Sequence, residues 1–222
     1  MKAAGAAATI ALFSVVACSS SGNPRADATP LSDECAAAVR ARPTDYASKD
    51  FFGLLTLGLL AINYPLPASF EDLMSRSDRV IVGRLQAVEE GNTYGGPRCS
   101  RTAHHTSNLV FQVERELRGD GRLGVAVEWL HTRVVLTDDL IAKKPDNRML
   151  AFLEDVRKYP PMPGADGGTP GPEKDLYYFR TPQGLVVEGE GGQLSIPLDP
   201  ETDRRLDVTG LTLDSLIQRL SN

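Results

Sequence analysis

The sequence predicts a mainly β domain: a small antiparallel barrel with a short helix at its N-terminal side and another at its C-terminus. Three observations support this fold class. Short runs of β-branched or alternating apolar residues recur at close spacing after residue 69, glycine-rich turns separate them, and only two segments in this region carry helix signals. Six to eight short strands favour a closed or nearly closed barrel, because an open sheet would expose its edges.

The strands are read from their residue patterns. Residues 79–88 are rich in β-branched side chains, and 108–117 alternate, with Leu109, Phe111 and Val113 facing one side of the strand. Such alternation predicts antiparallel sheet with one buried face. Further strands are expected at 123–130, 133–137, 148–153, 176–181, 184–188 and 193–196. Proline and glycine dominate 160–175, which predicts a mobile loop.

Helix signals occur at both ends of this region and once before it. Ser69 supplies a hydroxyl cap for a helix that ends near residues 77–78, and Thr212 caps an amphipathic helix over 212–220. Residues 33–40 combine helix formers with acids at the start and Arg40 at the end, the order that the helix dipole favours. We therefore expect three short helices.

An apolar stretch covers residues 51–62. Twelve residues are too few for a membrane span, so a helix buried by the domain or by a partner is the favoured interpretation. Contact with a membrane surface and a β-strand are the alternatives. The prolines at 65 and 67 end the stretch in each case.

The N-terminus has the features of an export signal. Lys2 precedes the uncharged residues 3–16, which would reach about 21 Å as a helix, short of the roughly 30 Å hydrocarbon layer. A cleaved signal peptide fits this length better than a permanent span. The chain of 222 residues has a net charge of -5 and no stripe of basic residues, which argues against a nucleic acid partner.

Residues Val15-Val16-Ala17-Cys18 resemble the lipobox of bacterial lipoproteins. The resemblance implies cleavage after Ala17 and acylation of Cys18, so the expected partner is the lipid bilayer, reached through acyl chains such as palmitate. The protein would then be lipid-anchored in the cell envelope, on the periplasmic or extracellular side. An ordinary secretory signal with an incidental cysteine is the alternative.

The remaining chain divides into three parts: a flexible tether over 18–30, a helical and apolar segment with a linker over 31–68, and the barrel domain over 69–222. Short motifs at 77–85, 116–120, 149–153 and 181–187 resemble those of uncharacterised bacterial secreted proteins and lipoproteins. Their domain is similar to OB-type or netrin/TIMP-like five-stranded barrels. The resemblance implies an OB-like barrel and brings no catalytic residue with it.

Two cysteines remain if Cys18 is acylated. Outside the cytoplasm, Cys35 and Cys99 are candidates for a disulfide bond, which would tie residues 31–64 to the barrel. Two free thiols are the alternative.

Other clusters give weaker signals. His104, His105 and His131 could be drawn with Cys99 as a zinc site, but adjacent histidines point to different sides of an extended chain. Acidic residues at 199, 201, 203 and 207 lack the glycine and glutamate of a calcium loop. We expect neither a metal nor another cofactor.

Aromatic side chains give the only candidate ligand surface. Trp129 and the run Tyr177-Tyr178-Phe179 could floor a groove, although core packing is the commoner role for aromatics on strands. No catalytic motif is present, so we expect a non-catalytic binding or scaffold module with an envelope protein as a further partner. The alternatives are an envelope hydrolase that uses carboxylates and a TIMP-like protease inhibitor.

Overall fold

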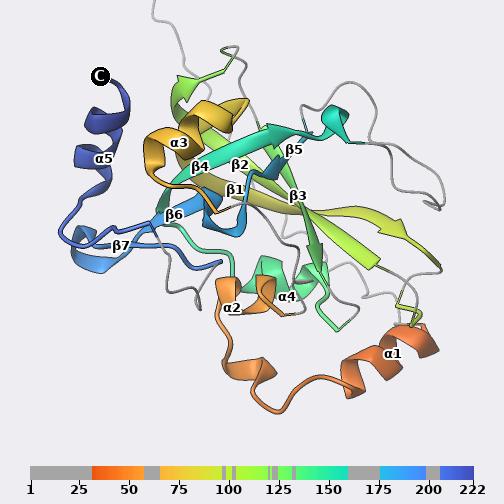
Figure 1. Cartoon of the computed structure of the whole chain (residues 1–222). Coiled ribbons are helices and arrows are strands. Elements are labelled where there is room, and N and C mark those ends of the chain that lie inside the picture. Colours follow the sequence, from red (N-terminus) through yellow and green to blue (C-terminus); the bar gives the residue numbers. More distant parts are fainter. Residues whose placement is uncertain are drawn as a thin grey trace, which may run out of the picture. The chain divides into compact units, whose positions relative to one another are not determined.

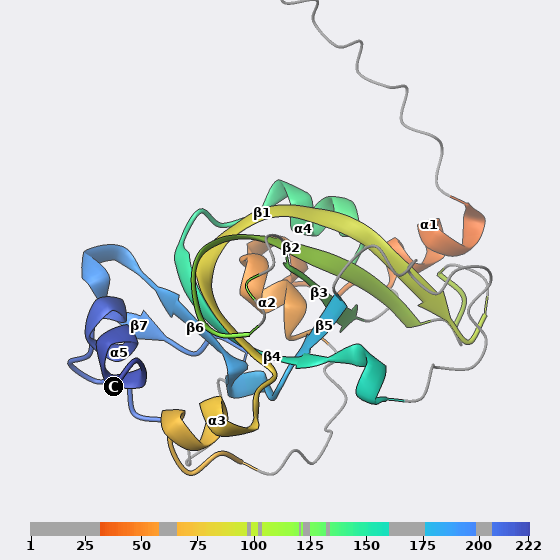
Figure 2. The ribbon, with the colours of Figure 1, turned by 90° about the horizontal axis from the view of Figure 1, so that it is seen from above.

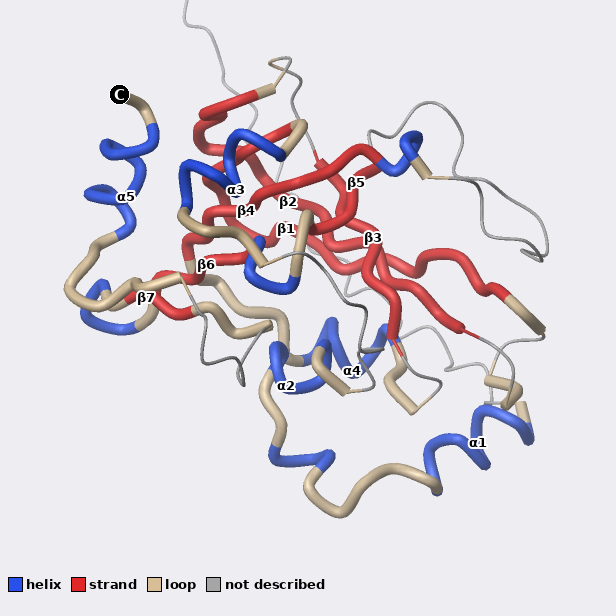
Figure 3. The backbone as a smooth tube through the Cα atoms, in the orientation of Figure 1, coloured by secondary structure: helices blue, strands red, loops and turns tan. Residues whose placement is uncertain are grey.

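The computed structural model describes residues 32–57, 66–96, 99–101, 104–119, 121, 125–131, 134–159, 176–198 and 206–222. In this part of the chain seven strands form one mixed sheet, with helices around it, so the expected mainly β fold is confirmed (Figures 1 and 3). The strands are β1 (Arg79–Tyr94), β2 (His104–Arg118), β3 (Val125–His131), β4 (Arg148–Asp155), β5 (Leu176–Phe179), β6 (Leu185–Glu188) and β7 (Leu194–Ser195). The α-helices are α1 (Asp33–Arg40), α2 (Phe51–Leu55), α3 (Phe70–Arg76), α4 (Thr137–Ala142) and α5 (Leu213–Leu220).

The strand order is β1-β2-β3-β5-β4-β6-β7, with an additional pairing between β1 and β4. Strand β1 pairs antiparallel with β2 on one side, and its first part pairs antiparallel with β4 on the other. The pairings therefore lead from β1 through β2, β3, β5 and β4 back to β1. Figure 2 shows β1 and β2 curving together along their length.

Two expectations about the sheet are wrong. The sheet is not purely antiparallel, because β3 and β5 run parallel, with Ala126 opposite Leu176 and Val127 opposite Tyr177. A parallel pair needs a long crossover between its strands, and here α4 and β4 lie between them in the chain.

The strand expected at 133–137 is also absent where the structure describes that segment, since residues 134–136 carry no strand and Thr137 begins α4. The Asp139 carboxylate explains the helix: it accepts a hydrogen bond from the Leu136 backbone N–H at 3.1 Å, and Arg42 and Tyr46 also donate to it. These two donors come from more than ninety positions earlier in the chain.

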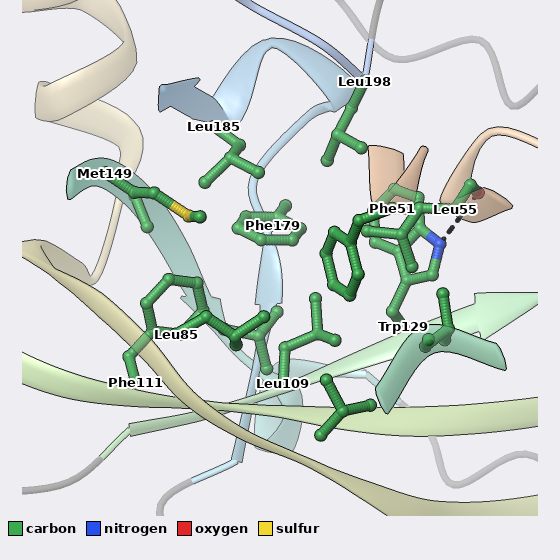
Figure 4. Packing of buried hydrophobic residues seen from close by; sticks show 14 of the residues in the cluster. Phe51, Leu55, Leu85, Leu109, Phe111, Trp129, Met149, Phe179, Leu185 and Leu198 are labelled. Carbon is green, nitrogen blue, oxygen red and sulfur yellow. Dashed lines mark hydrogen bonds between the residues drawn. The ribbon is translucent and has the colours of Figure 1, made fainter. Parts of the chain in front are cut away.

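The main core lies on the inner side of β1 to β5 and includes side chains from α2 (Figure 4). Phe51 and Leu55 of α2 pack in the same cluster as Trp129 and Phe179. The indole Nε1 of Trp129 donates to the Leu55 carbonyl oxygen at 3.0 Å, which fixes the helix against the sheet. The buried-helix interpretation of the apolar stretch is thus confirmed for Phe51–Leu55, while its residues 58–62 lie outside the described residues.

A second apolar cluster covers the opposite side of β1, β4 and β6, where α3 and α5 pack. Val80 and Val82 of β1 belong to this cluster, whereas Ile81 between them belongs to the main core. Burial on both faces explains why β1 and β4 begin as nearly continuous apolar runs instead of alternating ones.

The helix caps follow the sequence signals. Ser69 accepts from the Asp72 backbone N–H at 3.1 Å, and Thr212 accepts from that of Ser215 at 3.2 Å, so α3 and α5 begin where expected. Helix α1 also matches its expected bounds. Arg219 of α5 forms an ion pair with Glu71 of α3.

Candidate functional site

Strand β3 carries a buried carboxylate on its outer face. Its neighbours Val127 and Trp129 point into the main core, so Glu128 lies on the opposite face of the strand. Glu128 is nevertheless only 3% exposed. Its Oε1 atom accepts hydrogen bonds from Asn92 at 3.0 Å, Tyr94 at 2.9 Å and Thr106 at 3.0 Å, and its Oε2 atom accepts one from Tyr178 at 3.0 Å. All four donors are neutral side chains, and together they compensate the loss of water around the charge.

Four strands supply these groups. Asn92 and Tyr94 lie near the end of β1, where the register with β2 shifts between Glu90 and Thr93. Thr106 is on β2, and Tyr178 is on β5, which pairs with β3. A Cβ atom at Gly91 would lie 2.2 Å from the Thr106 hydroxyl oxygen, so the close approach of β1 to Thr106 requires glycine.

The two tyrosines keep their protons across a wide pH range. Burial, the negative charge of Glu128 and the hydrogen bond to Glu128 together raise the pKa of Tyr94 to about 12. Burial and the Glu128 charge likewise raise the pKa of Tyr178. Both hydroxyls therefore act as hydrogen-bond donors to the carboxylate at neutral pH.

A second carboxylate extends this face onto β4. Glu154 is buried and accepts a hydrogen bond from Tyr159 at 2.6 Å, and Arg180 donates to it as well. The Tyr159 ring meets the Tyr178 ring edge-on, with 5.8 Å between their centroids. Tyr159 is 44% exposed, the most accessible aromatic side chain among the described residues.

We call this surface the tyrosine face and define it by Tyr94, Tyr159, Tyr178, Glu128 and Glu154. It presents one accessible ring, that of Tyr159, beside three phenol hydroxyls that donate their hydrogen bonds to the two buried carboxylates. Such a surface can stack on a flat apolar group and exchange hydrogen bonds with hydroxyl or amide groups. Because donors already hold both carboxylates, recognition of polar groups suits it better than proton transfer.

The aromatic residues expected from the sequence to floor a groove divide between two roles. Trp129, Tyr177 and Phe179 belong to the main core, and the Phe179 ring lies 5.5 Å from that of Trp129. Figure 4 shows Trp129 and Phe179 in that core, which is the commoner role anticipated for them. Of the four, Tyr178 alone belongs to the tyrosine face.

The expected bond between Cys35 and Cys99 is confirmed, and it links positions 64 residues apart. Cys99 has a positive φ of 64°, and its backbone N–H donates to Nε2 of His105 at 2.8 Å. His105 is buried, whereas His104 is exposed, so the two rings lie on different sides of β2 as the extended chain predicts.

The described residues contain no group of three or more metal-binding side chains. The acidic residues at 199, 201 and 203 lie outside the described residues, and the Asp207 carboxylate accepts from the Thr209 backbone N–H at 2.8 Å.

Several sequence expectations fall on residues that the structure does not describe. These are the signal peptide and Cys18, the tether that follows, and the loop at 160–175. No helix among the described residues combines the length and the apolar character that crossing a membrane requires.

Most of the tyrosine face has no signal in the sequence. Glu128 occupies an outward position of an alternating strand, where a charged residue normally meets solvent. Its burial depends on Asn92, Tyr94 and Thr106, which the sequence places more than twenty residues away. The clustering of tyrosines near 159 and 177–178 was the one local signal.

Comparison of the chain with protein-family models, with curated proteins and with solved structures finds no significant match.

Proposed function

We propose that this protein is a lipoprotein of the cell envelope that binds its ligand through an OB-like barrel, without catalysing a reaction. Residues 15–18, which resemble a lipobox, support the anchor, and the uncharged stretch before them supports export. The tether at 18–30 would leave the domain free to move over the bilayer.

The strand pairings support the OB-like assignment. In this fold five strands form a partly open barrel. Here five strands are linked in a circuit, with β1 bordering both β2 and β4. The short helix α4 lies between β3 and β4 in the chain, outside that circuit.

The tyrosine face carries the functional proposal, because it combines an exposed aromatic ring with buried, fixed hydrogen-bonding groups. OB-fold domains bind oligonucleotides and oligosaccharides on the surface around their second and third strands. Glu128 lies on β3 and Thr106 on β2, within that region. Two carboxylates and a net charge of -5 disfavour a polyanion, so we infer an oligosaccharide as the ligand class.

The alternatives have less support. A hydrolase needs a carboxylate that can exchange a proton with its substrate. Glu128 already accepts four hydrogen bonds from the protein, so its oxygens are occupied. A TIMP-like inhibitor uses a free N-terminal cysteine, which acylation of Cys18 would block.

The ligand proposal is tested by titrating the full chain, solubilised in a nonionic detergent, with soluble glycan strands released from peptidoglycan. Calorimetry should detect saturable binding, and Tyr159→Ala should weaken it by about three- to tenfold because the stacking ring is lost. Ile141→Ala is the matched control, since Ile141 is another exposed large side chain but lies on α4. Absence of binding, or equal effects of the two substitutions, would refute the assignment to the tyrosine face.

The anchor is tested separately. Mass spectrometry of the protein purified from bacterial membranes should find acyl chains on Cys18, and Cys18→Ser should move the protein out of the membrane fraction. An unmodified thiol at that position would overturn this half of the proposal and leave the ligand test unaffected.

A further inference from the structure

A separate pocket of about 300 Å³ opens where the start of β1, the end of β2 and the turn after β4 meet. This volume is at the lower end of the range for small-molecule sites. The lining is rich in charged side chains, with four basic and two acidic residues: Arg79, Arg118, Arg157, Lys158, Asp78 and Asp155. None of them belongs to the tyrosine face.

Arg79 gives this pocket a buried cation. The residue is 1% exposed, and its Nη2 atom donates to Glu116 Oε2 at 3.1 Å. Its guanidinium carbon lies 5.7 Å from the centroid of the Tyr177 ring, a cation–π contact. The carboxylate and the ring together fix the guanidinium plane, and a fixed guanidinium is suited to bind the oxygens of an anion.

The acids of the pocket already have partners. Asp78 binds Lys158 at 2.6 Å, and Asp155 pairs with Arg157. Arg118 donates to the Met74 carbonyl oxygen at 3.2 Å and forms no ion pair with any residue that the structure describes. Arg118 therefore adds positive charge that no described acid balances.

The balance of charge points to an anionic ligand. The six charged lining residues carry two more positive than negative charges, and Glu116 behind Arg79 reduces that excess to one. A phosphate monoester carries about −1.5 to −2 charges at pH 7 and has three oxygens that accept strong hydrogen bonds. Its tetrahedral shape lets it accept from donors that approach from several strands, whereas a carboxylate has only two oxygens.

We propose that this pocket binds a phosphate group. The phosphate could belong to a soluble phosphate ester or to the headgroup of a phospholipid, and both present the same chemistry to the arginines. The pocket shares no residue with the tyrosine face, and this proposal does not depend on the ligand proposed for that face.

Inorganic phosphate is the first probe. The full chain in nonionic detergent is titrated with sodium phosphate, with sodium chloride of equal ionic strength as the reference. Saturable binding in the millimolar range or tighter is expected for phosphate only. Arg118→Ala should weaken binding by about ten- to a hundredfold, because a charge-assisted hydrogen bond is lost. Arg157→Ala, which removes a second cation of the lining, should also weaken it.

Arg115→Ala is the matched control. Arg115 lies on the same strand as Arg118, is exposed, and donates to Ser221 at 3.2 Å away from the pocket. The phosphate affinity of Arg115→Ala should stay within about twofold of that of the natural protein, since a distant surface charge contributes little. Trp129 fluorescence checks that each variant is folded.

Two competition experiments distinguish a soluble phosphate ester from a phospholipid headgroup as the natural ligand. Competition by glycerol 3-phosphate alone identifies a soluble ester, whereas competition by phosphatidic acid vesicles, but not by phosphatidylcholine vesicles, identifies a lipid headgroup. The proposal is overturned if phosphate does not saturate, or if Arg118→Ala and Arg115→Ala weaken binding equally.

Discussion

The disulfide between Cys35 and Cys99 should contribute a large share of the stability of this protein. The bond closes a loop between positions 64 residues apart. In the chain-entropy model a loop of this length stabilises the folded state by about 4 kcal/mol, because the cross-link restricts the denatured chain. Unfolding free energies of domains are about 5–15 kcal/mol, so a Cys35→Ser/Cys99→Ser double variant should lose a quarter or more of its stability.

Denaturant unfolding provides the assay. Trp129 is the single tryptophan and is buried in the main core, so its fluorescence reports unfolding directly. The double variant should unfold at lower denaturant concentration and with a steeper dependence on denaturant, since its denatured state exposes more surface. Reduction of the natural protein should reproduce both changes.

Cys18→Ser is the matched control, because it removes a sulfur that takes no part in the bond. It should unfold at the same denaturant concentration as the natural protein. A loss below about 1 kcal/mol in the double variant would contradict the reasoning, since the denatured chain would then be compact without the cross-link.

Two further predictions concern charged groups. Glu128→Gln should destabilise the protein by about 1–2 kcal/mol, because four hydrogen bonds lose their charged acceptor, and it should lower the pKa of Tyr94 from about 12. Ultraviolet titration of the phenolates checks this shift, and an unchanged titration curve would contradict it. Hydrogen bonding from Arg219, together with hydrogen bonds from the Glu71 backbone and Ser69, lowers the pKa of Glu71 from 4.5 to about 2. The ionised Glu71 therefore stabilises the fold above pH 4.5 and ceases to do so as pH falls towards 2. The pair is solvent-exposed, so its contribution is small. In acid unfolding the difference in stability between the natural protein and Glu71→Gln should vanish over that range, and a constant difference would refute the linkage.

Local signals in the sequence were sufficient to predict many of the elements. Ser69 and Thr212 cap helices because a side-chain hydroxyl binds a backbone N–H three residues away. The apolar runs of β1 and β4 are also local signals, because β-branched and other large apolar residues favour strands. The disulfide was also predictable, because Cys35 and Cys99 follow a segment that is expected to direct export, and paired cysteines outside the cytoplasm commonly form disulfides.

The features that could not be predicted from the sequence depend on contacts between residues far apart in the chain. The β-branched residues 134–135 suggested a strand, but Arg42 and Tyr46 bind Asp139 and favour the start of a helix. The parallel pairing of β3 with β5 depends on the path of the intervening chain. The two candidate sites were hidden for the same reason, since Glu128 and Arg79 acquire their partners from other strands.

The attachment of α2 to the sheet affects how this protein can be divided for laboratory work. Phe51 and Leu55 belong to the main core of the sheet, and the indole N–H of Trp129 donates a hydrogen bond to the Leu55 carbonyl oxygen. A recombinant fragment that begins at residue 69 would lack these side chains and would leave an apolar interior open to water. Recombinant fragments should therefore begin before Cys35, so that they retain both α2 and the cysteine that bonds to Cys99.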